Sequence, residues 1–269
     1  MLTTREPIFF KQKNQKFANI TKMLYLCTRM WKKIAIWIGW VLSCAALGYL
    51  VYRLAVYDNY SAFWQSFNEA GMVGYLVLCV AVALLPVQLM IETRKWQTML
   101  IGLVPVSFRE AWWQVIYGNV AAFVTPYRLG EYPGRIIEMG VEDISSVKSR
   151  IFDGNYWKDW RKWLRVLLLH LARYMVWMIQ LWAVLTFCGI ILSPQEAIIA
   201  IISYYFLITF MPSVPAAEVA FKGGWAVLIF SHFTENIPAI AVAVTIIWLI
   251  NTVLPVIVGI AFRGKNNKK

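Results

Sequence analysis

Long apolar runs decide what this chain can fold into. Runs of about 20 residues, each long enough to cross a bilayer, recur from Ile34 to the end of the sequence. The chain is 60% hydrophobic and 15% charged. Soluble domains, by comparison, average roughly 45–50% apolar and about 25% charged residues. The runs predict an all-α, polytopic helical membrane protein, and a length of 269 residues leaves room for a single membrane domain.

The positive charge is distributed as expected for a membrane protein. The net charge is +12, and its lysines and arginines gather at both ends and in one loop. Basic segments that flank apolar runs mark the cytoplasmic side and favour anionic headgroups, so we expect no nucleic-acid partner. We predict a basic cytoplasmic arm (1–33), one transmembrane domain (34–262) with a cytoplasmic amphipathic loop at about 141–165, and a basic cytoplasmic tail (263–269). The expected location is the cell inner membrane.

Four of the apolar runs are long enough for full spans. They cover approximately residues 34–54, 72–91, 166–191 and 237–262. We expect the second span to end at an interfacial anchor of cation and indole, Arg94–Trp96.

A run of helix breakers and charges, Thr125–Arg135, interrupts the apolar sequence. It holds two arginines and a glutamate among two prolines and two glycines. Charges at membrane depth are costly and usually mark a site. A broken helix is tolerated there only if its freed backbone is buried in protein or lines a cavity. The run therefore predicts a binding site.

Orientation constrains the two stretches that contain helix breakers. The loops before Phe108 and after Gly140 are both assigned to the cytoplasm, so the chain between them must turn back on itself. The same reasoning applies between Ser193 and Glu235, on the opposite side. We predict two re-entrant helical hairpins in a possible inverted repeat, an arrangement that builds substrate sites in many secondary transporters. The residues expected to break the helices are Pro126, Gly130, Pro133, Gly134, Pro212 and Pro215.

Several short pieces of sequence match one known pattern. They are Arg94–Trp96, Asn119, Pro126-x-Arg128-x-Gly130-Glu131, Arg135, Pro212–Ser213 and Glu218. With these pieces the chain resembles the flippase-type transmembrane region of the lysylphosphatidylglycerol synthase (MprF-type) family, in its stand-alone form without a synthase domain. The resemblance implies a lipid-binding or lipid-translocating module. The sequence departs from the family in lacking glycines just before Glu218 and in a longer spacing from Glu131 to Arg135.

Six polar residues are predicted to form the substrate site. Arg128 and Arg135 each offer a planar fork of donors to a phosphate, or they could instead snorkel to the interface or pair internally. Glu131 could cap the returning helix, pair with an arginine, or do both. The full set is Arg128, Arg135, Glu131, Glu218, Arg173 and Asn119.

The other members of this set each have a structural alternative. Glu218 could partner an arginine of the first hairpin or take up a proton, or it could cap the helix that follows it. Arg173 is expected to point into the helix bundle, and Asn119 could bond across helices, as is common in membrane bundles.

These residues favour a protein that binds and moves a phosphate-bearing lipid, either an anionic phospholipid or an isoprenoid-linked lipid. The alternative is a non-transporting scaffold or partner subunit for an envelope enzyme, and a homo-oligomer is also possible. We do not predict an enzyme, although an intramembrane lipid-modifying activity is a third reading. The chain has only two histidines, His170 and His232, far apart in sequence, so we expect no metal and no cofactor.

Overall fold

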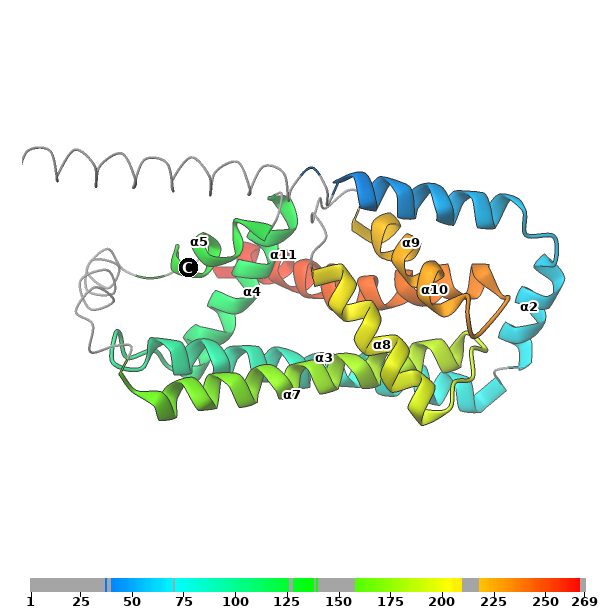
Figure 1. The fold of residues 1–269 in the computed structure, drawn as a ribbon. Helices are drawn as coiled ribbons and strands as arrows, with labels where there is room; N and C mark the ends of the chain where they lie inside the picture. The colour runs from blue at the N-terminus through cyan, green and yellow to red at the C-terminus, as the bar shows by residue number, and fades with distance from the viewer. Residues whose placement is uncertain are drawn as a thin grey trace, which may run out of the picture.

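The computed structural model describes residue 37 and residues 40–69, 71–125, 128–137, 139, 158–209 and 218–266. All regular structure in these residues is helical (Figure 1). Three helices are long and apolar enough to span a membrane: α3 (Gly71–Leu100), α7 (Trp160–Phe187) and the stretch Ile237–Phe262. The helices Trp40–Ala55 and α8 (Pro194–Thr209) are apolar but shorter. The arm 1–33 lies outside the described residues.

Helices α3 and α7 run side by side along the molecule (Figure 1). Helix α3 extends past the predicted end of its span, and Pro86 lies inside it. Helix α7 begins before the expected residue 166, because the Asp159 carboxylate accepts a hydrogen bond from the Lys162 backbone N–H and caps the helix at Trp160.

The helix is interrupted at the run of helix breakers Thr125–Arg135. Helix α4 (Phe108–Val124) begins with a capping box between Ser107 and Glu110 and ends just before the run of helix breakers. The chain resumes as α5 (Glu131–Ile136) and returns along α4.

Two glycines bring the backbones of this hairpin together. A Cβ on Gly130 would lie 2.5 Å from the Ala121 carbonyl oxygen, and one on Gly134 would lie 3.0 Å from the Tyr117 carbonyl oxygen. Gly130 thus lies against Ala121, and Gly134, four residues later, lies against Tyr117, four residues earlier. The two helices are therefore antiparallel.

Helices α8 and α9 (Glu218–Phe230) form a second pair of apolar helices. Helix α8 begins at Pro194, and Ser193 and Glu196 bond reciprocally across its first turn. The predicted breakers Pro212 and Pro215, like Pro126, lie outside the described residues. A short helix, α2 (Tyr60–Glu69), follows the helix Trp40–Ala55.

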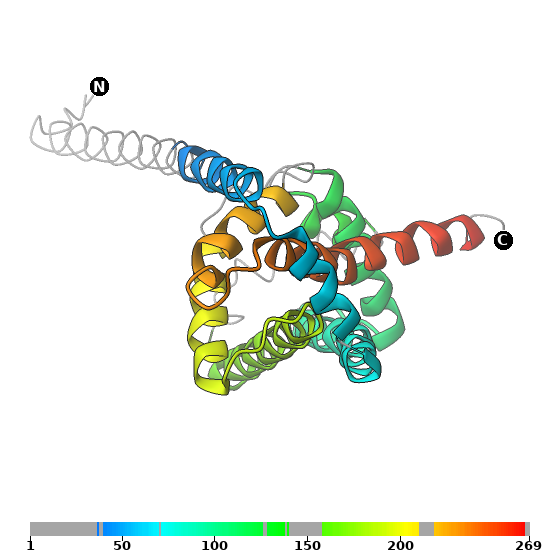
Figure 2. The same cartoon turned by 90° about the vertical axis from the view of Figure 1, so that its right-hand side faces the viewer.

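The last span occupies the predicted residues but is not one regular α-helix. Helix α10 (Ile237–Trp248) passes into a π-helical turn, η3 (Leu249–Val253), and then into α11 (Leu254–Asn266). Figure 2 shows this span passing between α8 and α9 on one side and α4 and α5 on the other.

The core lies where α7, α8, α9 and α10 meet. Its fully buried side chains include Leu181, Ile201, Phe230 and Ile240. Large apolar side chains also cover much of the outer surface, for example Met72, which is 88% exposed. An apolar exterior over an apolar core is typical of a protein whose solvent is lipid.

Candidate functional site

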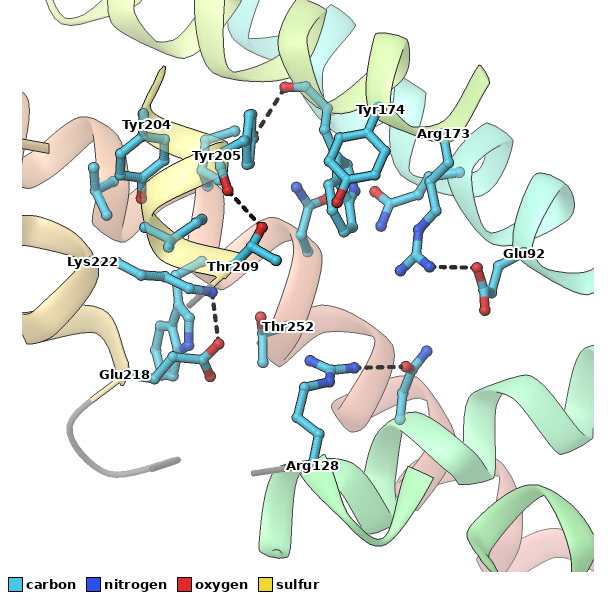
Figure 3. A pocket seen from close by; sticks show the side chains of 18 of the residues that line it. Glu92, Arg128, Arg173, Tyr174, Tyr204, Tyr205, Thr209, Glu218, Lys222 and Thr252 are labelled. Carbon is cyan, nitrogen blue, oxygen red and sulfur yellow. Dashed lines mark hydrogen bonds and ion pairs between the residues drawn. The ribbon is translucent and has the colours of Figure 1, made fainter. Parts of the chain in front are cut away.

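A cavity of about 450 Å³ lies between the two pairs of helices (Figure 3). Its volume falls in the range of roughly 300–1,000 Å³ that is usual for ligand sites. Charged and hydroxyl side chains from distant parts of the chain converge on it. The polar residues that line it are Gln88, Glu92, Asn119, Arg128, Glu131, Arg173, Tyr174, Tyr204, Tyr205, Thr209, Glu218, Lys222, Asn251 and Thr252.

Arg128 has an unusual backbone conformation at the turn of the α4–α5 hairpin. With φ at +54°, it is the only non-glycine residue in the described chain with a positive φ. This conformation costs an L-residue about 1–2 kcal/mol and clusters at functional sites. The turn is held by Thr125, whose hydroxyl accepts a hydrogen bond from the Gly130 N–H at 2.7 Å. The fold therefore keeps Arg128 in a strained position facing the cavity.

The Arg128 guanidinium is only loosely held within the protein. Its Nε donates to Glu131 at 3.2 Å, and its Nη2 donates to Asn119 at 3.4 Å. Its side chain is 37% exposed. It also lies close enough to Arg173 and Glu218 for their charges to interact. Arg128 thus has hydrogen-bonding capacity to offer a ligand.

Behind Arg128 lies a linked set of charges that we call the ion-pair network. Glu92, on α3, is its centre and is almost completely buried. Its carboxylate accepts from Lys95 at 2.7 Å, from Arg135 at 2.8 Å and from Arg173 on α7. The network consists of Glu92, Lys95, Arg128, Glu131, Arg135 and Arg173.

Glu131 and Arg135 connect the hairpin to this centre. Arg135 donates to Glu131 at 2.5 Å as well as to Glu92, and its side chain is 2% exposed. It also lies over the ring of Trp96, 5.1 Å from the centroid. Glu92 and Glu131 together hold Arg135, which lies behind the cavity wall, whereas Arg128 reaches the cavity.

The opposite wall carries a separate ion pair. Lys222 donates to Glu218 at 2.6 Å, one turn apart on α9. Sequence reasoning allowed an arginine of the first hairpin as the partner of Glu218, but the structure pairs it with Lys222. Glu218 is also the first residue of α9, as expected for a residue at a helix N-terminus.

Aromatic rings position Arg173 on the part of the cavity wall that α7 forms. Its guanidinium lies 4.5 Å from the centroid of the Trp177 ring, and Trp177 in turn stacks on Tyr205 of α8. Figure 3 shows Arg173 and Arg128 on one side of the cavity and Lys222 and Glu218 on the other. Two arginines from different elements thus lie near one another at the cavity.

Amide side chains form a polar layer next to the π turn. Gln180 is completely buried and donates to the Ala81 carbonyl at 2.9 Å, while Asn251 of η3 donates to the Gln180 side-chain oxygen at 3.1 Å. This chain of bonds ties α3, α7 and η3 together. π turns are frequent at functional sites, and Asn251 and Thr252 of this one line the cavity.

Several buried polar atoms that belong to cavity-lining residues have no partner among the described residues. Among them are the donors Arg173 Nε and Trp177 Nε1 and the acceptors Gln88 Oε1 and Asn251 Oδ1. Buried polar groups are almost always hydrogen-bonded, so these atoms leave bonds for an ordered water or a polar ligand group to complete.

The structure brings five of the six predicted substrate residues to the cavity wall. These are Asn119, Arg128, Glu131, Arg173 and Glu218. Arg135 contacts two of the carboxylates but does not line the cavity. Of the predicted hairpin residues, Gly130, Pro133 and Gly134 lie at the turn and in the first turns of α5.

One sequence-based interpretation of the α3 end is wrong. Arg94 is exposed, as an interfacial anchor should be, but Lys95 and Trp96 are buried and bond to Glu92 and Gln114. Helix α3 continues because these polar groups are satisfied inside the protein. Glu92 was not singled out from the sequence, because this end of α3 was placed at the membrane interface rather than inside the protein. The available signal was its spacing from Lys95, which places both on one helix face.

The fold and its apolar surface define an all-helical protein with three helices long and apolar enough to span a membrane. Comparisons with protein-family models, curated proteins and solved structures found no match. The resemblance to the lysylphosphatidylglycerol synthase transmembrane region therefore stays a prediction.

Proposed function

We propose that this protein binds the phosphate of a lipid headgroup in the cavity and moves the lipid between membrane leaflets. The observation that carries the proposal is the state of Arg128. Its backbone is strained, its side chain is partly exposed, and its two hydrogen bonds are long. A planar guanidinium in this state can form a bidentate contact with phosphate oxygens.

The neighbouring groups support the same ligand. Arg173 and Trp177 line the same cavity, and the buried Arg173 Nε and Trp177 indole N–H have no partner among the described residues. Arg135 braces this arrangement rather than binding the ligand, because its bonds to Glu92 and Glu131 hold the hairpin against α3.

In this proposal the α4–α5 hairpin is re-entrant from the cytoplasmic side, and the α8–α9 pair is its counterpart from the other side. With the helix Trp40–Ala55, the long helices then give about four full spans in the inner membrane, with both termini cytoplasmic. Both pairs line the same cavity, so relative movement of the pairs would open it alternately to each leaflet. The headgroup would stay in the polar cavity while its acyl chains remain in lipid.

Native mass spectrometry of the purified full chain, followed by lipid extraction, tests the proposal. We expect a phosphate-bearing lipid class to copurify with the wild type and with Arg109→Gln, a charge-matched change at an exposed residue. That lipid should be lost from Arg128→Gln and reduced in Arg128→Lys, which keeps the charge but removes the fork.

Transport is tested separately, by leaflet exchange of the same lipid in reconstituted vesicles. Equal lipid retention in all four proteins would refute the proposal and favour a scaffold role. If the lipid binds selectively but does not exchange between leaflets, the transport part of the proposal is wrong and the binding part stands.

A further inference from the structure

A phosphate group does not account for the whole cavity. It is small beside a volume of about 450 Å³. The free oxygens of a phosphodiester are also acceptors only, so they can bond to an arginine but not to an acceptor of the protein. The rest of the headgroup has to match the other groups that line the cavity.

Two buried acceptors at the cavity call for a hydrogen-bond donor. Gln88 is 4% exposed, and its side-chain oxygen has no partner among the described residues. The side-chain oxygen of Asn251 is buried and unpartnered in the same part of the chain. Both residues line the cavity. Because buried polar groups are almost always hydrogen-bonded, a donor other than the phosphate completes these bonds.

The two acceptors lie close to the groups that would hold the phosphate. Gln88 is one helical turn before Glu92 on α3, and Glu92 accepts from Arg173. Asn251 and Arg128 together line a small recess of about 10 Å³. A group attached directly to the phosphate would therefore lie next to both acceptors.

The charges of the wall favour a neutral donor over an ammonium group. Glu92, Glu131 and Glu218 line the cavity, and each already bonds to a lysine or an arginine. An ammonium headgroup would compete with these cations for the same carboxylate oxygens. A hydroxyl group is uncharged and both donates and accepts. It can therefore bond to the amides and leave the ion pairs intact.

A connected cluster of aromatic rings forms another part of the wall. Trp177 stacks on Tyr205 with 5.8 Å between ring centroids, and the rings of Tyr174 and Tyr204 lie 6.4 Å and 5.4 Å from that of Tyr205. All four residues line the cavity, and Figure 3 shows the three tyrosines at the end away from Arg128. Tyrosine and tryptophan combine an apolar ring with a polar edge. Such a wall fits a ligand ring that has C–H faces and carries hydroxyl groups.

We infer that the lipid carries a sugar or a sugar-like polyol next to its phosphate. The inference rests on the proposed function and narrows its substrate class. In this arrangement Arg128 and Arg173 hold the phosphate. Gln88 and Asn251 accept hydrogen bonds from hydroxyl groups, and the aromatic cluster contacts the ring.

Phospholipids that have the same acyl chains and the same headgroup charge test the inference. Dioleoyl phosphatidylinositol has the most free hydroxyl groups, dioleoyl phosphatidylglycerol has fewer, and dioleoyl phosphatidylethanol has none. Each is titrated into the delipidated full chain, and binding is measured by native mass spectrometry. We expect phosphatidylinositol to bind roughly tenfold or more tightly than phosphatidylethanol, as additional hydrogen bonds to both acceptors would give, with phosphatidylglycerol in between.

Gln88→Met locates the origin of this preference. Methionine resembles glutamine in shape but has only a weak acceptor in its thioether. The ratio of the phosphatidylinositol and phosphatidylethanol affinities should fall about threefold or more, as the loss of one hydrogen bond would give, while phosphatidylethanol binds as before. Gln65→Met is the same change at an exposed position of α2 and should leave the ratio unchanged.

Free inositol monophosphate distinguishes a lipid site from a site for a soluble sugar phosphate. It offers the same phosphate and hydroxyl groups without acyl chains, so we expect it to compete only weakly. Competition as strong as that by phosphatidylinositol would reject a lipid as the ligand.

The outcomes separate this inference from the proposed function. If the wild type binds all three lipids equally and Arg128→Gln weakens each of them, the polyol inference is wrong and the phosphate site stands. If Arg128→Gln changes none of the affinities, the phosphate site is wrong and the inference that rests on it fails too. If Gln88→Met keeps the whole preference, water rather than the headgroup satisfies Gln88, and the inferred position of the polyol is wrong.

Discussion

Glu92→Gln is the substitution that most directly tests the centre of the ion-pair network. The wild-type carboxylate bonds to Lys95 at 2.7 Å, to Arg135 at 2.8 Å and to Arg173, and it is almost completely buried. Glutamine has nearly the same shape but no charge, so three cations would lose their shared counter-ion. Removing one partner of a buried ion pair costs roughly 3–5 kcal/mol.

The size of this loss can be converted into a melting temperature. A change of 1 kcal/mol shifts the Tm of a chain of this length by about 2–4 °C. We therefore expect the Tm of Glu92→Gln to fall by roughly 6–20 °C. Thermal unfolding of the detergent-purified full chain, followed by tryptophan fluorescence, measures it.

Glu196→Gln provides the matched control. Glu196 is exposed and bonds to Ser193 at the start of α8, and losing a helix cap costs about 0.5–2 kcal/mol. A Glu92→Gln shift no larger than the control shift would refute the role of Glu92 as the network's centre. In addition, the double variant Glu92→Gln/Arg173→Gln should lose less stability than the sum of the single variants, because its remaining cations repel one another less.

Three further changes test the hairpin and the polar layer. In Gly118→Ala the new Cβ would lie 2.6 Å from Arg135 Cγ, so we expect a loss of about 1–3 kcal/mol in thermal unfolding; Gly48→Ala, with open space around it, should cost nothing. Arg128→Gly should raise stability by about 1 kcal/mol through relief of backbone strain while abolishing lipid retention; unchanged retention would contradict the proposed site. Gln180→Leu removes the bonds to the Ala81 carbonyl and to the half-buried Asn251 side chain and should cost about 1–3 kcal/mol; a neutral result would show that this layer adds no stability.

The sequence predicted those features of the fold that depend on local signals. Helix α4 runs from Phe108 to Val124, because a capping box starts it and the run of helix breakers Thr125–Arg135 ends it. The last span also lies within the expected residues 237–262. The break itself was predictable because proline, glycine and charge coincide in one short run.

The network was hidden from sequence reasoning because its contacts are tertiary. Glu92 and Arg135 are 43 positions apart, and Glu92 and Arg173 are 81 positions apart. No local pattern pairs them. A carboxylate and a lysine after an apolar run usually mark the water interface, and that ordinary interpretation concealed a buried pair. The π turn was equally hidden, since Leu249–Val253 reads as regular apolar helix.

The π turn also determines how the last span meets its neighbours. Before it, Ala239 and Ala243 of α10 are fully buried in the core. After it, Gly259 of α11 lies against α4, where a Cβ would be 2.6 Å from a methyl carbon of Val120. A π turn accommodates one additional residue, and one residue corresponds to about 100° of rotation in an α-helix. Deleting one residue within Leu249–Val253 would therefore convert the π turn to regular α-helix and rotate Gly259 away from α4. The α10 half could then stay packed in the core only if the α11 half lost its contact with α4.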